Sequence, residues 1–176
     1  MCYFITATLP KTAPLEALDA LARKLGRQFQ PLVNPVVSAQ LPSGAAYFAT
    51  TLGHCDCGTV LGSARRARAH EPDWSQEKSK LLKKGWSVTK IARALKQRQQ
   101  SREKAGQGQT VRLESFVSGI IESGLTTELG LLLHSYSGGL DESFRIRLEQ
   151  VSNGPELASF LPSAQEDVLY LFRAGA

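Results

Sequence analysis

The residues with the clearest chemical potential are the cysteines, of which the chain has only three. Cys55 and Cys57 lie in the tetrapeptide His54-Cys55-Asp56-Cys57, and the third is Cys2. If the tetrapeptide is extended, Cys55 and Cys57 point to the same side, because side chains alternate along a strand. If the segment before them pairs with the N-terminal segment, Cys2 can approach the same place.

Three thiols and one imidazole form a donor set that suits zinc, which prefers sulfur and nitrogen ligands. We therefore expect the three cysteines to form a structural or zinc-binding cluster. The expected fourth ligand is His54, with His70 or His134 as alternatives. Paired zinc ligands are usually separated by two to four residues, so the Cys-x-Cys spacing also leaves open a redox dithiol and simple packing of the cysteines in the core.

Cys2 also permits a nucleophilic alternative. Its small side chain favours removal of Met1, which would leave an α-amino group that can act as the base of its own thiol. The opening Met1-Cys2 resembles the N-terminus of class II glutamine amidotransferases, in which an N-terminal cysteine attacks an amide. The resemblance covers two residues and implies a Cys2-dependent enzyme, although Tyr3 stands where that family usually has glycine.

Positive charge is concentrated in one part of the chain. Between Arg65 and Lys104 there are 13 lysines and arginines and four acids, a net charge of +9, whereas the rest of the chain carries −4 and the whole +5. Such a segment attracts acidic proteins, nucleic acids or anionic surfaces, or is a solvated helical face. The residues that we expect to contact a partner are Lys83, Lys84, Lys90, Arg93, Lys96 and Arg98.

Residues 80–96 resemble the first half of a helix-turn-helix of the resolvase and invertase type. The similar features are a helix that ends at Gly85, and Ser87 at the start of a second helix with an apolar stripe. The resemblance implies nucleic-acid binding. Residues 97–100, Gln-Arg-Gln-Gln, follow without a turn, so the helix that would enter the major groove is missing. Contacts of the basic residues with phosphate remain as the alternative.

Hydrophobic periodicity predicts the elements that must position these residues. Strands are expected at 2–9, 45–52, 128–136, 143–149 and 167–173, and helices at 13–26, 75–84, 87–104, 111–123 and 156–161. Val88, Ile91, Ala92 and Leu95 form the apolar stripe of the helix at 87–104, which we expect to end at Gly106 and Gly108. We expect the strand at 143–149 to form a hairpin with the strand before it.

This order favours an α+β fold with one mostly antiparallel sheet, helices packed on one face, and a basic helical insertion or lid at 63–107 within a single domain of residues 1–176. With 42% hydrophobic residues, the chain can build its own core. It has no apolar run long enough for a membrane span and no signal-like N-terminus, so we expect a cytoplasmic protein.

The common catalytic motifs are absent: the chain has no phosphate loop, no G-x-G-x-x-G, no H-E-x-x-H and no G-x-S-x-G. We therefore expect a non-catalytic intracellular binding module that docks an acidic protein, in the manner of an inhibitor or immunity protein, with zinc as the only expected cofactor. One alternative is a thiol-dependent enzyme that uses Cys2, or Cys55 and Cys57 as a redox pair. The other is a nucleic-acid binder that uses residues 65–104.

Overall fold

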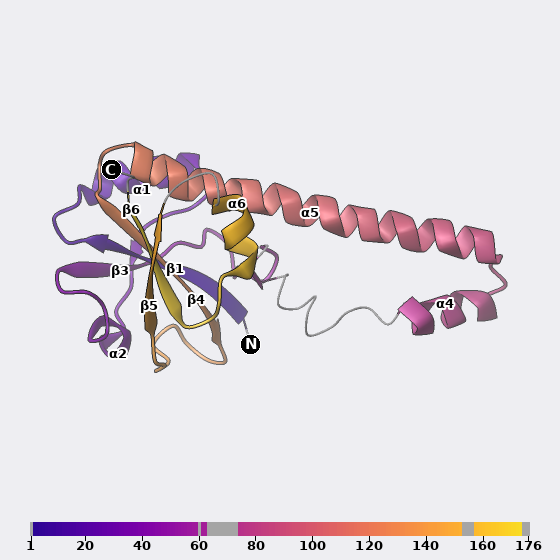
Figure 1. The fold of residues 1–176 in the computed structure, drawn as a ribbon. Coiled ribbons are helices and arrows are strands. Elements are labelled where there is room, and N and C mark those ends of the chain that lie inside the picture. The colour runs from indigo at the N-terminus through magenta and orange to yellow at the C-terminus, as the bar shows by residue number, and fades with distance from the viewer. Residues whose placement is uncertain (1, 60, 63–73, 153–156, 174–176) are drawn as a thin grey trace.

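A computed structural model describes residues 2–59, 61–62, 74–152 and 157–173, and it confirms the α+β class (Figure 1). The strands are β1 (Cys2–Pro10), β2 (Gln30–Pro31), β3 (Ala45–Ala49), β4 (Glu128–Tyr136), β5 (Arg147–Ser152) and β6 (Val168–Arg173). The helices are α1 (Leu15–Lys24), α2 (Pro35–Ser38), α4 (Trp74–Lys83), α5 (Val88–Glu122) and α6 (Leu157–Phe160), with the 3-10 helix η1 (Leu161–Ser163) after α6.

The strands form one six-stranded sheet in the order β2-β3-β1-β4-β6-β5. All pairs are antiparallel except β5 with β6, so the prediction of a mostly antiparallel sheet is confirmed. The predicted strand at 167–173 is β6, and it lies between β4 and β5 as its apolar residues on both faces require.

The main core lies on one face of the sheet. Leu18 of α1, Phe116 and Ile120 of α5 and Leu157 of α6 are buried there against the sheet. The other face is covered by the short helix α2, whose Val37 belongs to a smaller apolar cluster. Helices α1, α5 and α6 therefore pack on one face, as expected, while α2 and its neighbouring loops close the other.

The predicted hairpin between 128–136 and 143–149 is wrong. Phe144 and Ile146 pack against the smaller apolar cluster from a loop, so their alternation reflects loop packing rather than a strand. The strand begins only at Arg147 and pairs in parallel with β6. Parallel strands need a crossover connection, and the segment that contains α6 provides it.

The predicted end of the basic helix at Gly106 and Gly108 is also wrong, because α5 runs without a break from Val88 to Glu122. A glycine inside a helix costs about 1 kcal/mol relative to alanine. Ending one helix and nucleating another would leave unsatisfied backbone groups and repeat the cost of nucleation. Because the C-terminal half of α5 is anchored in the core, continuing the helix through both glycines is the less costly solution.

Helix α4 and the N-terminal half of α5 form a helical hairpin that projects away from the sheet (Figure 1). We call residues 74–101 the arm and the remaining described residues the body. At 1.5 Å per residue, α5 is about 50 Å long. Leu81 and Ile91 are buried within the arm, whereas Val88 of the predicted stripe is 62% exposed. None of the helices in the described part of the chain is both long enough and apolar enough to span a membrane.

Candidate functional site

The three cysteines meet at one end of the body, because β1 pairs with β3. The antiparallel register sets Thr6 opposite Ala49, and continuing it toward the start of β1 brings Cys2 alongside the loop that follows β3. This loop is irregular, so the strand alternation considered above does not apply. The Sγ atoms of Cys2, Cys55 and Cys57 nevertheless lie within 4.8 Å of one another. We call these residues the thiol cluster.

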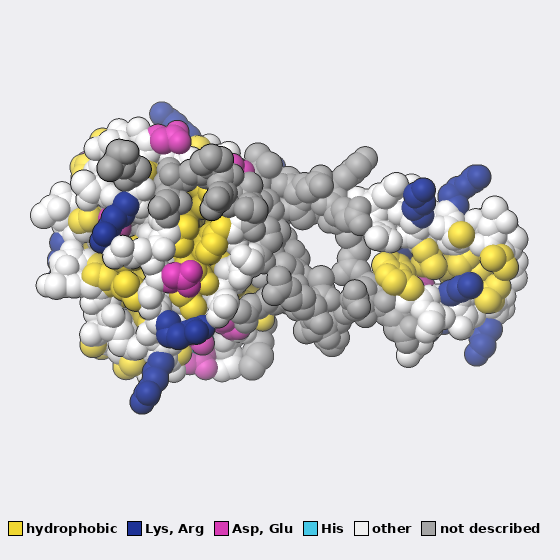
Figure 2. Space-filling model, in the orientation of Figure 1, with side chains coloured by type: hydrophobic (Ala, Val, Ile, Leu, Met, Phe, Trp, Pro, Cys, Tyr) yellow, Lys and Arg dark blue, Asp and Glu magenta, His cyan; other side chains and the backbone are white. Residues whose placement is uncertain are grey.

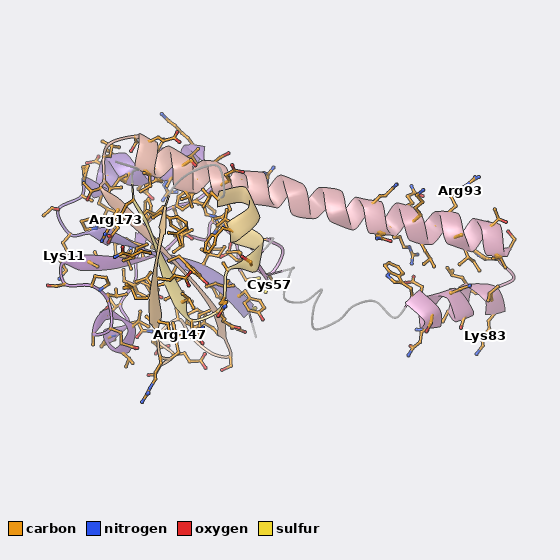
Figure 3. The ribbon with its side chains drawn as sticks, viewed as in Figure 1. Lys11, Cys57, Lys83, Arg93, Arg147 and Arg173 are labelled. Carbon is orange, nitrogen blue, oxygen red and sulfur yellow. The ribbon has the colours of Figure 1, made fainter. Side chains whose placement is uncertain are left out.

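Hydrogen bonds to β1 hold the loop in place. The backbone N–H of Asp56 donates to the carbonyl oxygen of Tyr3 at 2.7 Å, and the backbone N–H of Ile5 donates to Asp56 Oδ2 at 2.8 Å. The backbone N–H of Tyr3 donates to the sulfur of Cys57 at 3.3 Å. Figure 3 shows Cys57 beside the start of β1. The loop thereby extends the pairing of β1 beyond the last residue of β3.

A buried ion pair fixes the same loop from its other side. Arg27 Nη1 lies 2.8 Å from Asp56 Oδ1 and also donates to the Thr50 hydroxyl at 3.2 Å. The Thr51 hydroxyl donates to Asp56 Oδ2. Asp56 is only 2% exposed, so its carboxylate is fully engaged as an anchor. The sequence alone gives no sign of this role, because Arg27 is distant along the chain and no local pattern links it to Asp56.

Gly62 lies where the chain leaves this loop, and there it passes very close to the backbone of Asp56 and Cys57. A Cβ atom at Gly62 would overlap the carbonyl oxygen of Asp56 and lie 2.8 Å from Cys57 Cα. Both obstacles are backbone atoms, which cannot move aside as a flexible side chain can. Glycine is therefore required for the close approach of this segment to the thiol cluster.

The three thiols differ in exposure: Cys2 is exposed, Cys55 is half-buried and Cys57 is buried. The Cys57 backbone N–H lowers the pKa of the Cys55 thiol, but the Cys57 thiol, burial, and negative charge on Cys57 and Cys2 raise it, and the net pKa lies above the ordinary value. Without a cation, negative charge on one sulfur therefore opposes ionisation of its neighbours.

Of the histidines considered as a fourth ligand, the two that the structure describes, His54 and His134, do not join the thiol cluster. His54 is exposed and is not part of the group of converging ligand atoms, and His70 lies outside the described residues. His134 belongs to a separate group with Glu166 and Asp167. Its Nδ1 lies 2.6 Å from Asp167 Oδ1, and its ring stacks on Phe144 at a centroid distance of 3.6 Å.

The His134 ring itself packs against aromatic residues. His134 Nε2 is buried and has no hydrogen-bond partner among the described residues. Tyr136 packs edge-on against the imidazole, and burial raises the pKa of the Tyr136 phenol far above its ordinary value. The hydroxyls of Tyr136 and Tyr47 lie 3.3 Å apart, and burial likewise raises the pKa of Tyr47. Both phenols are therefore neutral at physiological pH.

A cavity of about 500 Å³ lies beside the thiol cluster. Cys55 and Asp56 are part of its wall, together with three basic residues, Lys24, Arg27 and Arg112. The Arg27 guanidinium is engaged by Asp56, so Lys24 and Arg112 supply the charge that is not used in that ion pair. The cavity could receive a small anion next to a thiol.

The basic residues predicted to contact a partner lie on the arm and are exposed. Figure 2 shows Lys and Arg side chains spread over the arm with hydrophobic side chains among them, and in Figure 3 Lys83 and Arg93 point away from opposite sides of the hairpin. Within the described arm, Arg98 pairs with Glu77, and the Lys90 ammonium lies 4.3 Å from the Trp86 ring centroid.

The turn of the arm is built from local signals. Gly85 has a φ of +77°, the left-handed conformation that favours glycine, and it ends α4. The Ser87 hydroxyl accepts the Lys90 backbone N–H at 3.3 Å and caps α5. The predicted helix end and helix start are both confirmed. The two helices lie side by side as a hairpin, and α5 then continues into the body without a third, groove-reading helix (Figure 1).

Comparison with known proteins gives no matching family, no similar curated protein and no similar solved structure.

Proposed function

We propose that this protein is a binding module whose arm docks an acidic protein. The observation that carries the proposal is the combination of charge and exposed apolar surface at the turn of the arm. The arm holds eight basic residues and one acid, Glu77. Leu82 and Val88 flank the turn, with side chains 44% and 62% exposed, beside Lys83 and Lys84.

Exposed apolar residues favour a protein over a nucleic acid as the partner. Phosphate contacts need only cations, whereas the core of a protein interface buries apolar side chains within a polar rim. A nucleic-acid binder usually gathers its cations on one face, but Lys83 and Arg93 point away from opposite sides of the arm (Figure 3). An acidic recess that receives the turn end-on would contact Leu82, Val88 and the lysines around them.

A cytoplasmic location, expected from the sequence, also forms part of this proposal. The sulfur atoms of the thiol cluster lie within 4.8 Å of one another, so a reducing compartment is needed to keep them as thiols. Disulfides persist in oxidising compartments and are rare in the cytosol.

The proposal is tested by binding to three probes of equal charge: an all-glutamate peptide, an acidic peptide with interspersed leucines, and a DNA duplex. The double variant Lys83→Glu/Lys84→Glu should slow association with both peptides and flatten its salt dependence. The double variant Leu82→Ser/Val88→Ser should lower the affinity for the leucine-containing peptide about tenfold, which corresponds to roughly 1.4 kcal/mol of lost apolar burial. Its affinity for the all-glutamate peptide should be unchanged.

The matched control is Lys11→Glu/Arg145→Glu, which makes the same change of charge at exposed positions of the body. Association rates should stay close to those of the unmodified protein, because the charge on the arm is intact. If the duplex binds more tightly than either peptide and Leu82→Ser/Val88→Ser has no effect, nucleic-acid binding replaces this proposal. If Lys83→Glu/Lys84→Glu and Lys11→Glu/Arg145→Glu reduce the association rate equally, the arm is excluded as the docking surface.

A thiol-dependent enzyme is the second candidate function, because Cys55 lines a cavity whose wall also includes Lys24 and Arg112. Their charge would attract an anionic substrate to the thiol. The N-terminal nucleophile alternative needs Cys2 and the removal of Met1, and Met1 lies outside the described residues. The thiol-reactivity measurement described below separates this candidate from a metal site.

A further inference from the structure

We propose that Cys2, Cys55 and Cys57 form a three-thiolate zinc site that clamps the start of β1 to the loop after β3, with the fourth coordination position open to solvent. The proposal does not depend on the docking function of the arm. It rests on the convergence of three sulfur atoms from distant parts of the chain and on the rigid support beneath them.

The spacing of the sulfurs fits a zinc ion after small side-chain adjustments. Tetrahedral zinc with Zn–S bonds of about 2.3 Å requires sulfurs about 3.8 Å apart. The three Sγ atoms already lie within 4.8 Å of one another. Cys2 and Cys55 are not fully buried, so rotation of these side chains can close the remaining gap without moving the core.

The loop is held independently of the metal. Asp56 lies between Cys55 and Cys57, and its carboxylate is occupied by Arg27, Thr51 and the backbone of Ile5. These contacts orient the cysteines and also remove Asp56 as a ligand. Preorganised ligands lose less freedom when they bind, which favours a specific site over chance proximity.

Electrostatics favours the binding of a divalent cation among the three neighbouring sulfur atoms. Each thiol releases its proton to solvent on binding, because zinc coordinates the thiolate. Three thiolates without a cation repel one another. The N–H of Tyr3 donates to the Cys57 sulfur and holds it beside the start of β1. A soft, sulfur-preferring ion such as zinc is therefore the expected occupant, rather than magnesium or calcium.

The fourth position is assigned to solvent, because no fourth histidine, cysteine or carboxylate of the described residues joins the group. His54 is next to Cys55 in the chain but outside the group. The exposed side of the site, at Cys2, would therefore hold a water or an exchangeable soft ligand.

The test is metal binding by the full chain, prepared under reducing conditions without chelator. Native mass spectrometry should show one zinc per chain, lost on acidification. Titration with Co²⁺ should give the sulfur-to-cobalt charge-transfer band of a thiolate site. Native alkylation of the thiols should slow when zinc is added, because coordinated thiolates are shielded from the reagent.

Substitutions identify the ligands. Cys2→Ser is the primary variant, because Cys2 is exposed and its loss should leave the fold intact. Zinc affinity should fall by more than about 100-fold, beyond the range typical of residues that only support a ligand. His54→Ala is the matched control, an exposed neighbour whose loss should leave zinc affinity within about threefold of the original.

Four results would overturn the proposal. A protein that binds neither Zn²⁺ nor Co²⁺ has no such site. A mass that is lower by two hydrogens, restored by reductant, would indicate a disulfide and therefore a redox pair. Free thiols that react rapidly in the folded protein and are not protected by zinc would favour the thiol-enzyme candidate. Equal loss of affinity in His54→Ala and Cys2→Ser would show that the coordination is not the three-thiolate arrangement.

Discussion

At the residue scale, Asp56 links the thiol cluster to the core. Its carboxylate pairs with Arg27 at 2.8 Å and accepts the backbone N–H of Ile5, while its own backbone N–H bonds to Tyr3. One side chain thereby joins the loop after β3, the segment after α1 and strand β1. Buried charges of this kind are stable only as a pair, because desolvation penalises each partner alone.

Replacing Asp56 with asparagine should lower the free energy of unfolding by about 3–5 kcal/mol, since it leaves the buried Arg27 without its counter-ion. Urea denaturation measures the loss. Removing both charges in Arg27→Met/Asp56→Asn should cost less than the sum of the two single variants, and that double-mutant cycle reports the coupling. A loss below 1 kcal/mol in Asp56→Asn would mean that the ion pair does not anchor the loop.

At the element scale, two glycines allow neighbouring elements to approach closely, because glycine has no Cβ atom. Gly130 of β4 lies opposite Thr8 of β1 in the sheet register. A Cβ there would overlap the Thr8 hydroxyl and lie 2.9 Å from Leu169 Cδ1. Gly119 of α5 lies against α1, where a Cβ would be 2.9 Å from Leu25 Cδ1, the end of a flexible side chain.

These two contacts predict opposite tolerances to alanine. Gly130→Ala should destabilise the body by about 1–3 kcal/mol, because its neighbours on both sides belong to the packed centre of the sheet. Gly119→Ala should be close to neutral, because movement of Leu25 is offset by the gain of about 1 kcal/mol in helix propensity. Thermal unfolding of the two variants measures this difference in stability. Equal losses of stability would contradict the close approach of Thr8 and Leu169 to Gly130.

At the scale of the whole molecule, α5 joins two packing units. Its C-terminal half is part of the main core, and its N-terminal half belongs to the arm with α4. Ile91 and Ile120 lie on this one helix and are both almost fully buried, at 1% and 0% exposure. Ile91 is covered within the arm and Ile120 within the body.

Replacing isoleucine with alanine should therefore destabilise a different part of the molecule at each of these two positions. Ile120→Ala should lower the stability of the body by about 2–5 kcal/mol, the usual cost of a core cavity. Ile91→Ala should speed hydrogen exchange at residues 74–101 while the amides of β1 and β4 keep their protection, because local units open independently. Faster exchange throughout the body of Ile91→Ala would show instead that arm and body unfold together.

The sequence by itself determined the elements with strong local patterns. The strands that became β1, β4 and β6, the helix that became α1, and the cap and turn residues Ser87 and Gly85 follow from periodicity and backbone preference, which act between near neighbours. These patterns were sufficient for the α+β class and for the concentration of charge on one helical segment.

Only the tertiary structure decided which distant residues meet. Cys2 joins Cys55 and Cys57 because β1 pairs with β3, and Arg27 reaches Asp56 across the same fold. Packing against the core also carried α5 through Gly106 and Gly108, against their local preference. Such contacts depend on strand pairing and buried surface between segments far apart in the chain, and local sequence patterns carry no record of that pairing.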